Sequence, residues 1–397
     1  MKKILVLGGS EKSFPLVKYA KEQGYHVLLC DRNPHNPCRY YVDEFVQVST
    51  TDIDGIIKIG RDESVDGVVS FGSDLMAETA ALVGQALGLP ANPHNAVATM
   101  GHKDRFRSFL RTHGFPSPRS SAFTSFQDAW NHRRSFQLPV IVKPIDSAGS
   151  TAVSKIEDWS ELQKAFNLAA GSSRSKTVLI EEFITSSHKH MIAGDAFVMG
   201  GEVVFWGLLN SHRGLPEYPY LPTGTSSPIF LNEEQISEVK STVQSVIDAL
   251  GFRFGGINLE LMYDVHGDLY VVEIAARNGG NYIPELLQMA TGVNIIGALV
   301  EASLDQPVSV EVSKNSCYTA ALMLYSKKEG AFKKVELSES IKKNVVETIL
   351  TIKPGESVKV FDRATHAIGV IFLQFDSLDE QEKKLEQFSE HVSVIVV

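Results

Sequence analysis

The sequence has few cysteines, no surplus of positive charge and no long apolar run. The three cysteines, Cys30, Cys38 and Cys317, form no CxxC or metal-spaced pair and suit a reducing compartment. Lysine and arginine total 38 against 47 aspartates and glutamates, and this formal net charge of −9 argues against a nucleic-acid binder. The apolar run near the N-terminus ends at Leu7, which is too early for a signal peptide. We therefore expect a cytoplasmic protein without nucleic-acid or membrane partners.

The first 90 of the 397 residues alternate strand-like and helix-like segments. The expected strands are 4–7, 26–30, 45–48 and 67–71, and the expected helices are 14–23, 53–61 and 75–87. This alternation predicts a parallel sheet with ligands at the carboxyl ends of its strands. The dinucleotide fingerprint GxGxxG is lacking, because Ser10 and Ser13 replace its second and third glycines, so a nicotinamide cofactor is not expected. The residues that would border a small-molecule pocket, or simply end strands, are Gly8, Ser10, Gly72, Ser73 and Asp74.

Two acidic residues stand on otherwise apolar strands in the second half of the chain. Strands are expected over 257–263 and 269–275, and a tight turn at His266-Gly267 would place Glu260 opposite Glu273. One face would then hold Asn258, Glu260, Met262, Val271, Glu273 and Ala275. Facing like charges destabilise a sheet unless a cation lies between them, and Mg²⁺ takes carboxylate and phosphate oxygens. Glu260 and Glu273 are therefore candidate metal ligands, with a solvated hairpin face as the alternative.

Groups that bind anions follow this hairpin. Arg277 comes two residues after the second strand, and Asn278-Gly279-Gly280 leaves backbone N–H groups open to an anion. Pro284 suits the first turn of a helix that Gly292 ends. A metal, a guanidinium, glycine amides and a helix N-terminus would converge here, which favours a phosphate site.

Two lysines upstream fit the same chemistry. A helix expected over 96–111 carries Lys103, which by itself would be one charge on a solvated basic helix. A buried strand over 138–143 ends in Lys143, and small and hydroxyl-bearing residues fill 145–151. A lysine beside such a loop suits phosphate binding, although the loop is not the GxxxxGK[ST] P-loop.

The rest of the chain supplies further mixed structure. Strands are expected over 177–180, 195–199, 202–208, 318–325, 345–352, 368–375 and 392–397, and helices over 159–170, 233–250 and 379–390. The segment 210–224 has an irregular pattern. Residues after about 304 contain no acid/base cluster, so they are expected to form a lobe that packs on the preceding domain or contributes to a homodimer interface. Asp362, Arg363 and His366 are further candidates for contact with a second substrate.

Taken in order, these parts resemble the ATP-grasp superfamily, most closely its carbamoyl-phosphate synthase and amino-acid ligase branch. The resemblance covers residues 91 to about 305, and its motifs are Lys103, strand-Lys143-Pro-x₄-Gly-Ser, Glu181-Glu182-Phe183-Ile184, Glu260, Glu273 and Arg277. It implies an α/β and α+β multidomain protein. An open parallel α/β domain (1–90) would precede an ATP-grasp fold of two α+β subdomains (91–305, lid subdomain about 116–184) and a small C-terminal α+β lobe (306–397).

The resemblance also implies roles for individual residues. The ATP-binding residues would be Lys103, Lys143, the lid-loop residues Ser147, Gly149, Ser150 and Thr151, the adenine-hinge residues Glu181, Glu182, Phe183 and Ile184, and His190 at the ribose. Glu260 and Glu273 would hold Mg²⁺ or Mn²⁺, and Arg277 and Lys143 would be catalytic. The substrate-binding residues would be Arg277, Gly279, Gly280, Ser73 and Asp74.

Two departures from the family pattern bear on these roles. The family usually has Glu-x-Asn-x-Arg, whereas Ala275 stands at the Asn position here, so that either Asn258 or Asn278 would have to compensate. The usual ribose-binding acid is also absent, and His188 or His190 stands in that region.

The activity implied is an ATP-dependent carboxylate–amine ligase. A substrate carboxylate would attack the γ-phosphate, and an amine would attack the acyl-phosphate to give an amide or peptide bond, ADP and phosphate. The partners would be a small-molecule carboxylate and an amine. Two alternatives stay open, namely an enzyme of nucleotide or carbamoyl-phosphate metabolism that activates formate or bicarbonate, and a non-catalytic ATP-binding module. Arg277→Ala or Glu273→Ala is expected to abolish turnover.

Overall fold

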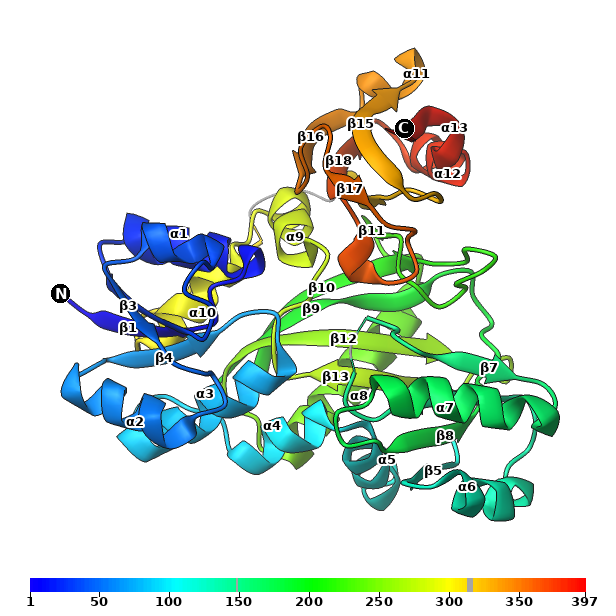
Figure 1. The fold of residues 1–397 in the computed structure, drawn as a ribbon, viewed down its shortest axis with the longest axis horizontal. Coiled ribbons are helices and arrows are strands. Elements are labelled where there is room, and N and C mark those ends of the chain that lie inside the picture. Colours follow the sequence, from blue (N-terminus) through cyan, green and yellow to red (C-terminus); the bar gives the residue numbers. More distant parts are fainter. Residues whose placement is uncertain (148, 313–316) are drawn as a thin grey trace.

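The fold follows from a computed structural model that describes residues 1–147, 149–312 and 317–397 (Figure 1). Its N-terminal sheet is parallel throughout, in the order β3-β2-β1-β4. The elements are β1 (Lys3–Leu7), α1 (Phe14–Glu22), β2 (His26–Asp31), β3 (Glu44–Gln47), α2 (Ile53–Asp62), β4 (Gly67–Ser70) and α3 (Asp74–Leu87). The open parallel α/β arrangement expected from the sequence is thus confirmed.

The two faces of this sheet are covered by helices from distant parts of the chain. On one face, α1 and α10 (Ile295–Ser303) share a core with the sheet, in which Ile296 and Val300 contact the strand residues. On the other face, α2 and α3 contribute Ile56 and Val83 to a second core. A helix that follows the central hairpin therefore completes the N-terminal layer, which brings the two regions together (Figure 1).

The central sheet is antiparallel, and among the described residues it has the order β13-β12-β9-β10-β11-β14-β18-β16. Its strands are β9 (Met191–Met199), β10 (Glu202–His212), β11 (Gly224–Ser227), β12 (Gly255–Tyr263), β13 (Leu269–Ala275), β14 (Tyr318–Leu324), β16 (Val345–Leu350) and β18 (Gly369–Phe375). One face packs on α8 (Glu233–Leu250) and the other on α9 (Ile283–Thr291). The last three strands of that order come from the C-terminal region, which joins the central sheet through the β11–β14 pair.

A smaller antiparallel sheet of order β5-β8-β6-β7 lies beside the central one. Its elements are β5 (Ser120–Phe123), α6 (Phe126–His132), β6 (Val140–Pro144), β7 (Ser154–Ile156), α7 (Leu162–Ser172) and β8 (Val178–Glu182). Apolar side chains of α6 and α7 form its core with the strands. Lys143 and Glu181 lie on its two adjacent middle strands.

The C-terminal region also contains a short sheet of order β17-β15-β19. Its elements are β15 (Gly330–Leu337), α11 (Glu339–Lys342), β17 (Ser357–Val358), α12 (Leu378–Glu386), α13 (Phe388–His391) and β19 (Val392–Val396). The sequence pattern did not indicate β15, because charged side chains such as Lys333 and Lys334 interrupt its apolar residues. The division into domains at residues 90 and 305 stays a prediction.

The single helix predicted over 96–111 is two helices, α4 (His94–Gly101) and α5 (Lys103–Thr112). The extended backbone of His102 (φ −123°, ψ 113°) separates them. Lys103 is therefore the first residue of α5, and its backbone N–H donates to Ile145 O at 3.3 Å. This break directs Lys103 towards the loop after β6.

Within the described part of the chain, no helix has the length and apolar composition to cross a membrane alone. Helices α9 and α10 have the required length and apolar composition only when they are taken together, and a bend of 109° separates them.

Candidate active site

The β12–β13 hairpin places Glu260 directly opposite Glu273, as predicted. The predicted tight turn is wrong, because the ladder closes at Tyr263–Leu269 and the Asp264 N–H donates to Asp268 O at 3.0 Å. The pairing shifts by one residue between Leu261 and Glu260, and this irregularity offsets the error in the turn.

The same shift corrects the predicted face of β13. Val271 is fully buried in the core with α8, so it does not share the face of Glu273. On β12 the burial alternates as predicted, and Asn258, Glu260 and Met262 are all partly exposed.

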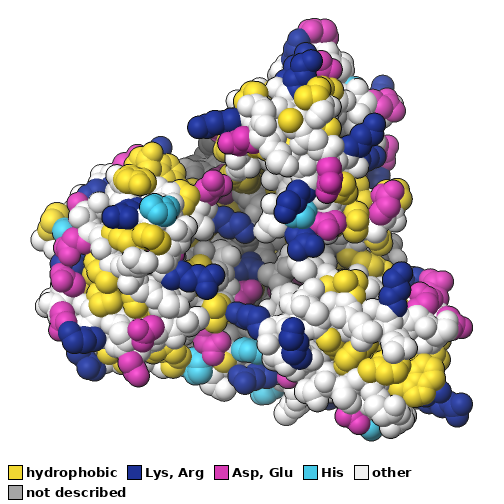
Figure 2. All heavy atoms as spheres, in the orientation of Figure 1, with side chains coloured by type: hydrophobic (Ala, Val, Ile, Leu, Met, Phe, Trp, Pro, Cys, Tyr) yellow, Lys and Arg dark blue, Asp and Glu magenta, His cyan; other side chains and the backbone are white. Residues whose placement is uncertain are grey.

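A cleft of about 260 Å³ lies over this hairpin, between the small sheet, the central sheet and the N-terminal loops. Figure 2 shows dark blue Lys and Arg side chains in the hollow of this face. The predicted site residues that line the cleft are Lys103, Lys143, Ser147, Gly149, Ser150, Glu181, Glu182, Phe183, Ile184, Glu260, Glu273, Arg277 and Gly280. The predicted residues outside its lining are Gly8, Ser10, Ser73, Asp74, Thr151, His190 and Gly279, whereas Gly72 lies within it.

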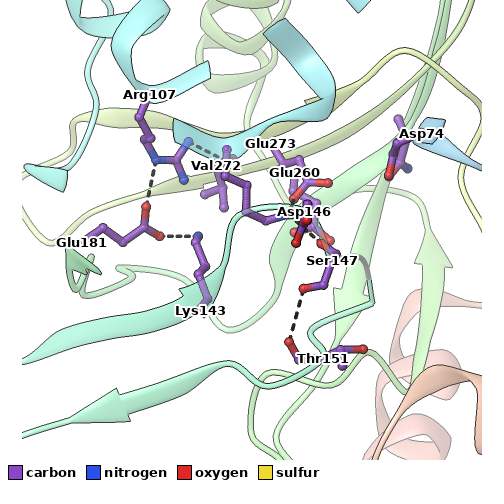
Figure 3. Close-up of polar contacts among 12 residues, drawn as sticks. Asp74, Arg107, Lys143, Asp146, Ser147, Thr151, Glu181, Glu260, Val272 and Glu273 are labelled. Carbon is purple, nitrogen blue, oxygen red and sulfur yellow. Dashed lines mark hydrogen bonds and ion pairs between the residues drawn. The ribbon is translucent and has the colours of Figure 1, made fainter. Parts of the chain in front are cut away.

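Each of the two facing carboxylates has its own cation. Glu260 Oε1 lies 2.6 Å from Arg213 Nη2, and Glu273 Oε2 lies 3.5 Å from Lys103 Nζ. Burial raises the pKa of Glu273, but the attraction of Lys103 and Arg277 outweighs this effect and leaves the pKa below its usual value. Glu273 is therefore held as an anion, in the state that a metal ligand requires. Figure 3 shows it beside Glu260.

The two carboxylates suit a magnesium ion whose other ligands would come from a nucleotide and from water. The described residues contain no group of three or more His, Cys, Asp and Glu side chains that would enclose a metal. A pair of carboxylates is what Mg²⁺ commonly takes from a protein when phosphate oxygens and waters complete its octahedron.

Of the two asparagines considered as substitutes for the missing ligand at Ala275, Asn258 lies opposite Ala275 and lines the cleft, as expected, whereas Asn278 does not line it. Asn258 Oδ1 accepts from Arg277 Nη1 at 3.1 Å, and its Nδ2 donates to Asp195 Oδ1 at 2.9 Å. Asn278 is fully buried, and its Nδ2 donates to Asp195 Oδ2 at 3.2 Å. An amide oxygen has a second lone pair, so Asn258 stays a candidate ligand beside Glu260 and Glu273, whereas the buried Asn278 lies outside the lining of the cleft.

Lys143 is organised by a buried ion-pair network that the sequence did not reveal (Figure 3). Glu181 forms ion pairs with Lys143 Nζ and with Arg107 Nε of α5, the latter at 2.9 Å, and Arg107 Nη1 also donates to Val272 O at 2.8 Å. Burial raises the pKa of Glu181, but the two cations outweigh it and lower the pKa to about 2. Burial lowers the pKa of Lys143, and Glu181 opposes that effect.

The two acids expected at the adenine hinge, Glu181 and Glu182, therefore interact with other groups of the protein. Glu181 is committed to Lys143 and Arg107, and Glu182 Oε1 accepts from Gln137 N at 2.9 Å. The cleft at this end is bordered by Phe183 and Ile184, which leaves backbone groups and apolar surface for a flat ring.

The loop after β6 is held over the cleft. Lys103 Nζ donates to Ser147 O at 2.8 Å, and Ser147 Oγ donates to Thr151 O at 3.4 Å. Ser150 Oγ donates to Tyr220 O at 2.9 Å, which joins the loop to the irregular segment before β11. Ala364 of the C-terminal region also lines the cleft.

Arg277 joins the hairpin to the N-terminal domain. Its Nε donates to Asp74 Oδ1 at 3.0 Å, and its Nη1 donates to Asn258 Oδ1 and to Asn278 O, the latter at 3.2 Å. Burial lowers the pKa of Arg277, but Asp74 and Glu273 outweigh this effect and raise it. Ser73 Oγ accepts from Met76 N and so caps α3. Neither Ser73 nor Asp74 lines the cleft, so each would affect a bound substrate only indirectly, Asp74 through its ion pair with Arg277.

Asp195 on β9 anchors the loop that carries Arg277. It is fully buried and accepts from Gly279 N at 2.8 Å, in addition to the two asparagine amides. Burial raises its pKa to about 6, although these hydrogen bonds lower it. Nothing in the local sequence distinguishes this residue, because its partners lie far along the chain.

We expect Asp195→Asn to lower the catalytic rate about 10²-fold, because a misplacement of reacting groups by about 1 Å has an effect of that size. The wild-type rate should decrease as the pH falls below about 6, because a protonated Asp195 accepts the Gly279 N–H less well. The variant should lose this dependence of the rate on pH. Asp264→Asn is the matched control, since Asp264 is a buried carboxylate that accepts backbone N–H groups of the hairpin turn. A pH profile unchanged in Asp195→Asn would contradict this role.

The histidines proposed for the ribose lie elsewhere. The His190 ring is 4.3 Å from the ring of His212 and 5.8 Å from that of Phe230, and it borders a separate small pocket. Burial lowers its pKa to about 4. His188 Nε2 accepts from Tyr263 N at 3.0 Å. The placement of His190 at the ribose is therefore corrected, because its ring packs against those of His212 and Phe230 and does not line the cleft.

Residues 136–285 match the family model of the ATP-grasp domain. An uncharacterized protein of Sinorhizobium fredii is 25% identical over 289 residues, which cover 71% of this chain and 58% of that protein. The carbamoyl phosphate synthase large chain of Vibrio cholerae is 23% identical over 299 residues, which cover 69% of this chain and 26% of that one. The chain thus corresponds to only part of these relatives.

Solved structures resemble the whole chain. The L-amino acid ligase of Bacillus licheniformis has a TM-score of 0.84 at 19% identity, with 100% of this chain and 99% of that one covered. The phosphoribosylglycinamide synthetase of Anaerococcus prevotii has a TM-score of 0.77 at 22% identity, with both chains fully covered at 100%. The N5-carboxyaminoimidazole synthetase of Staphylococcus aureus, complexed with ADP, has a TM-score of 0.76 at 17% identity, covering 97% and 96%.

Proposed function

Because the chain contains an ATP-grasp domain and has the full-length fold of ATP-grasp ligases, we propose that it is an ATP-dependent carboxylate–amine ligase. The observation that carries this proposal is the facing pair Glu260 and Glu273, each compensated by a cation, in a cleft that also contains Lys143 and Arg277. The product would be an amide or peptide bond, formed with release of ADP and phosphate.

The cleft divides into two ends with different chemistry. Phe183 and Ile184 border the end near Lys143, which suits the purine ring and the phosphates attached to it. Arg277 and Gly280 border the other end, which suits the reacting acid. A magnesium ion held by Glu260 and Glu273 would supply charge neutralisation at the terminal phosphates, which are the atoms between these two ends.

The residues of the chain would act mainly by position and charge. Lys103 and Arg213 balance the two carboxylates, and both are close enough to contact phosphate oxygens that approach Glu260 and Glu273. Arg277 would stabilise the phosphoryl group as the substrate carboxylate attacks it. The loop containing Ser147 and Ser150 would exclude water from the acyl-phosphate until the amine attacks.

A second candidate is an enzyme that activates a small acid such as bicarbonate or formate. The match to carbamoyl phosphate synthase large chains favours it. The two candidates share the phosphate end of the cleft and differ in the acid that is accepted.

Release of ADP should depend on a carboxylate, and it should stop when EDTA removes the divalent metal. Because two carboxylates of the protein and the phosphates would share the ion, Mg²⁺ or Mn²⁺ should restore the activity. The measurement is ADP formation with panels of carboxylic acids and amines, and reactions without acid serve as controls. Small acids alone would identify the second candidate, and no release with any acid would contradict both.

A further inference from the structure

Lys12 reaches from the N-terminal domain to the loop that carries Arg277. It lies in η1 (Glu11–Ser13), directly after β1, and it lines the cleft together with Gly72 and Gly280. A Cβ placed on Gly72 would be 3.7 Å from Lys12 Cδ, and a Cβ placed on Gly280 would be 3.7 Å from Lys12 Nζ. The methylene chain therefore passes over one glycine and brings the ammonium beside the other.

Lys12 differs from the other cations of the cleft in having no anionic partner. Lys103 and Lys143 pair with Glu273 and Glu181, and Arg213 pairs with Glu260. Arg277 pairs with Asp74. Among the described residues Lys12 forms no ion pair, although it lines the same cleft.

The surroundings of Lys12 favour a bound anion. Loss of solvation in the cleft and the nearby Arg277 both lower its pKa, against a smaller opposing effect of Asp74. An anion beside the ammonium would relieve that repulsion and add a charge-assisted hydrogen bond. The position also follows the rule for parallel sheets, because η1 and Gly72 lie at the carboxyl ends of β1 and β4.

The location separates this group from the nucleotide. In Figure 3, Asp74, the partner of Arg277, lies on one side of Glu260 and Glu273, whereas Lys143 and Glu181 lie on the other. Lys12 belongs to the side of Asp74, because it contacts the region of Gly72 and Gly280. An anion there would be part of the substrate that meets the phosphoryl group.

We infer that Lys12 binds a second anionic group of the acid substrate, a carboxylate or a phosphate, while the reacting carboxylate lies at Arg277. The substrate class is thus an acid with two anionic groups. This inference rests on the proposed ligase function and narrows it. Lys12 is a specificity-determining residue in this account, since it would contact a part of the substrate that does not react.

The test compares acids that differ by one anionic group. Protein saturated with Mg²⁺ and a non-hydrolysable β,γ-imido analogue of ATP, which fills the phosphate end, is titrated calorimetrically with succinate or butyrate, and with O-phospho-L-serine or L-serine. In at least one pair, wild-type protein should bind the acid with the additional anionic group about tenfold or more tightly than the acid that lacks it. This is the size of effect expected for a hydrogen bond to a charged group. The succinate pair reports a carboxylate and the phosphoserine pair a phosphate.

The variants decide whether Lys12 is responsible. Lys12→Gln should reduce the preference to about twofold or less without changing the affinity for the nucleotide analogue, and Lys12→Arg should keep it. Lys18→Gln is the matched control, because Lys18 lies on α1 with 62% of its side chain exposed and pairs with Glu22 at 3.8 Å. A preference that persists in Lys12→Gln, or its absence from wild-type protein, would overturn the inference. Failure of the nucleotide analogue to bind, or an absence of ADP release, would instead count against the ligase function.

Discussion

Replacing Arg277 with alanine should lower the rate of ADP release by about 10³-fold or more while the protein stays folded. The guanidinium is held by Asp74 and Asn258, so its position is set before any substrate arrives. A preorganised cation contributes most where negative charge develops during phosphoryl transfer. The measurement is steady-state ADP formation, together with circular dichroism to confirm folding. Glu273→Ala is expected to have an effect of similar size.

Three comparisons separate this role from a structural one. Arg61→Ala removes an exposed arginine of α2 and should leave the rate unchanged. Arg277→Lys keeps the charge but lacks the planar donor geometry, so it should restore only part of the activity. Asp74→Asn removes the ion pair but leaves the guanidinium, and its loss should be smaller than that of Arg277→Ala. Equal rates for Arg277→Ala and wild-type protein would defeat the assignment.

Glu181→Gln should reduce the free energy of unfolding by about 3–5 kcal/mol, which is the usual result of breaking a buried ion pair by removing one partner. The change leaves Lys143 and Arg107, both buried, without their counter-charge. Guanidinium denaturation measures the effect. Glu182→Gln is the matched control, because Glu182 lies at the end of the same strand and accepts one backbone N–H. This variant should lose only about 1 kcal/mol of the free energy of unfolding.

The same carboxylate predicts how stability depends on pH. The pKa of Glu181 is about 2 in the folded protein against an ordinary value of 4.5, so the unfolded chain binds the proton more readily. The stabilisation is therefore complete above about pH 4.5 and is lost as the pH falls from there towards about 2. Glu181→Gln should flatten this part of the profile. Equal losses of stability in the Glu181 and Glu182 variants would contradict the network.

Local rules predicted the elements whose ends are set by nearby residues. Helix α8 begins and ends as predicted, because Asn232 and Gln235 form a capping box and Gly251 takes the left-handed conformation at its end. The parallel sheet of the first domain was equally predictable, since its apolar strands alternate regularly with helices. The predicted pairing of Glu260 with Glu273 was right only because the wrong turn is offset by a one-residue shift in the pairing that the sequence did not predict.

Long-range contacts account for what the sequence did not reveal. Lys12 and Arg107 have no local motif, and their roles depend on Gly280 and Glu181, which are distant in the chain. Asp195 was overlooked for the same reason. Conversely, His190 follows the hinge in sequence but faces His212, because the packing of neighbouring strands decides where it points. The chemistry of the motifs was predictable, whereas the groups that hold them in place were not.

The most direct test of the central claim is the Mg²⁺ dependence of ATP binding, measured by calorimetry in wild-type protein and in the double variant Glu260→Gln/Glu273→Gln. If these facing carboxylates hold the ion that bridges to the nucleotide, Mg²⁺ should strengthen ATP binding to wild-type protein by about tenfold or more, or about 1.4 kcal/mol. In the double variant, Mg²⁺ should no longer strengthen it. The same Mg²⁺ enhancement in both proteins would contradict the account.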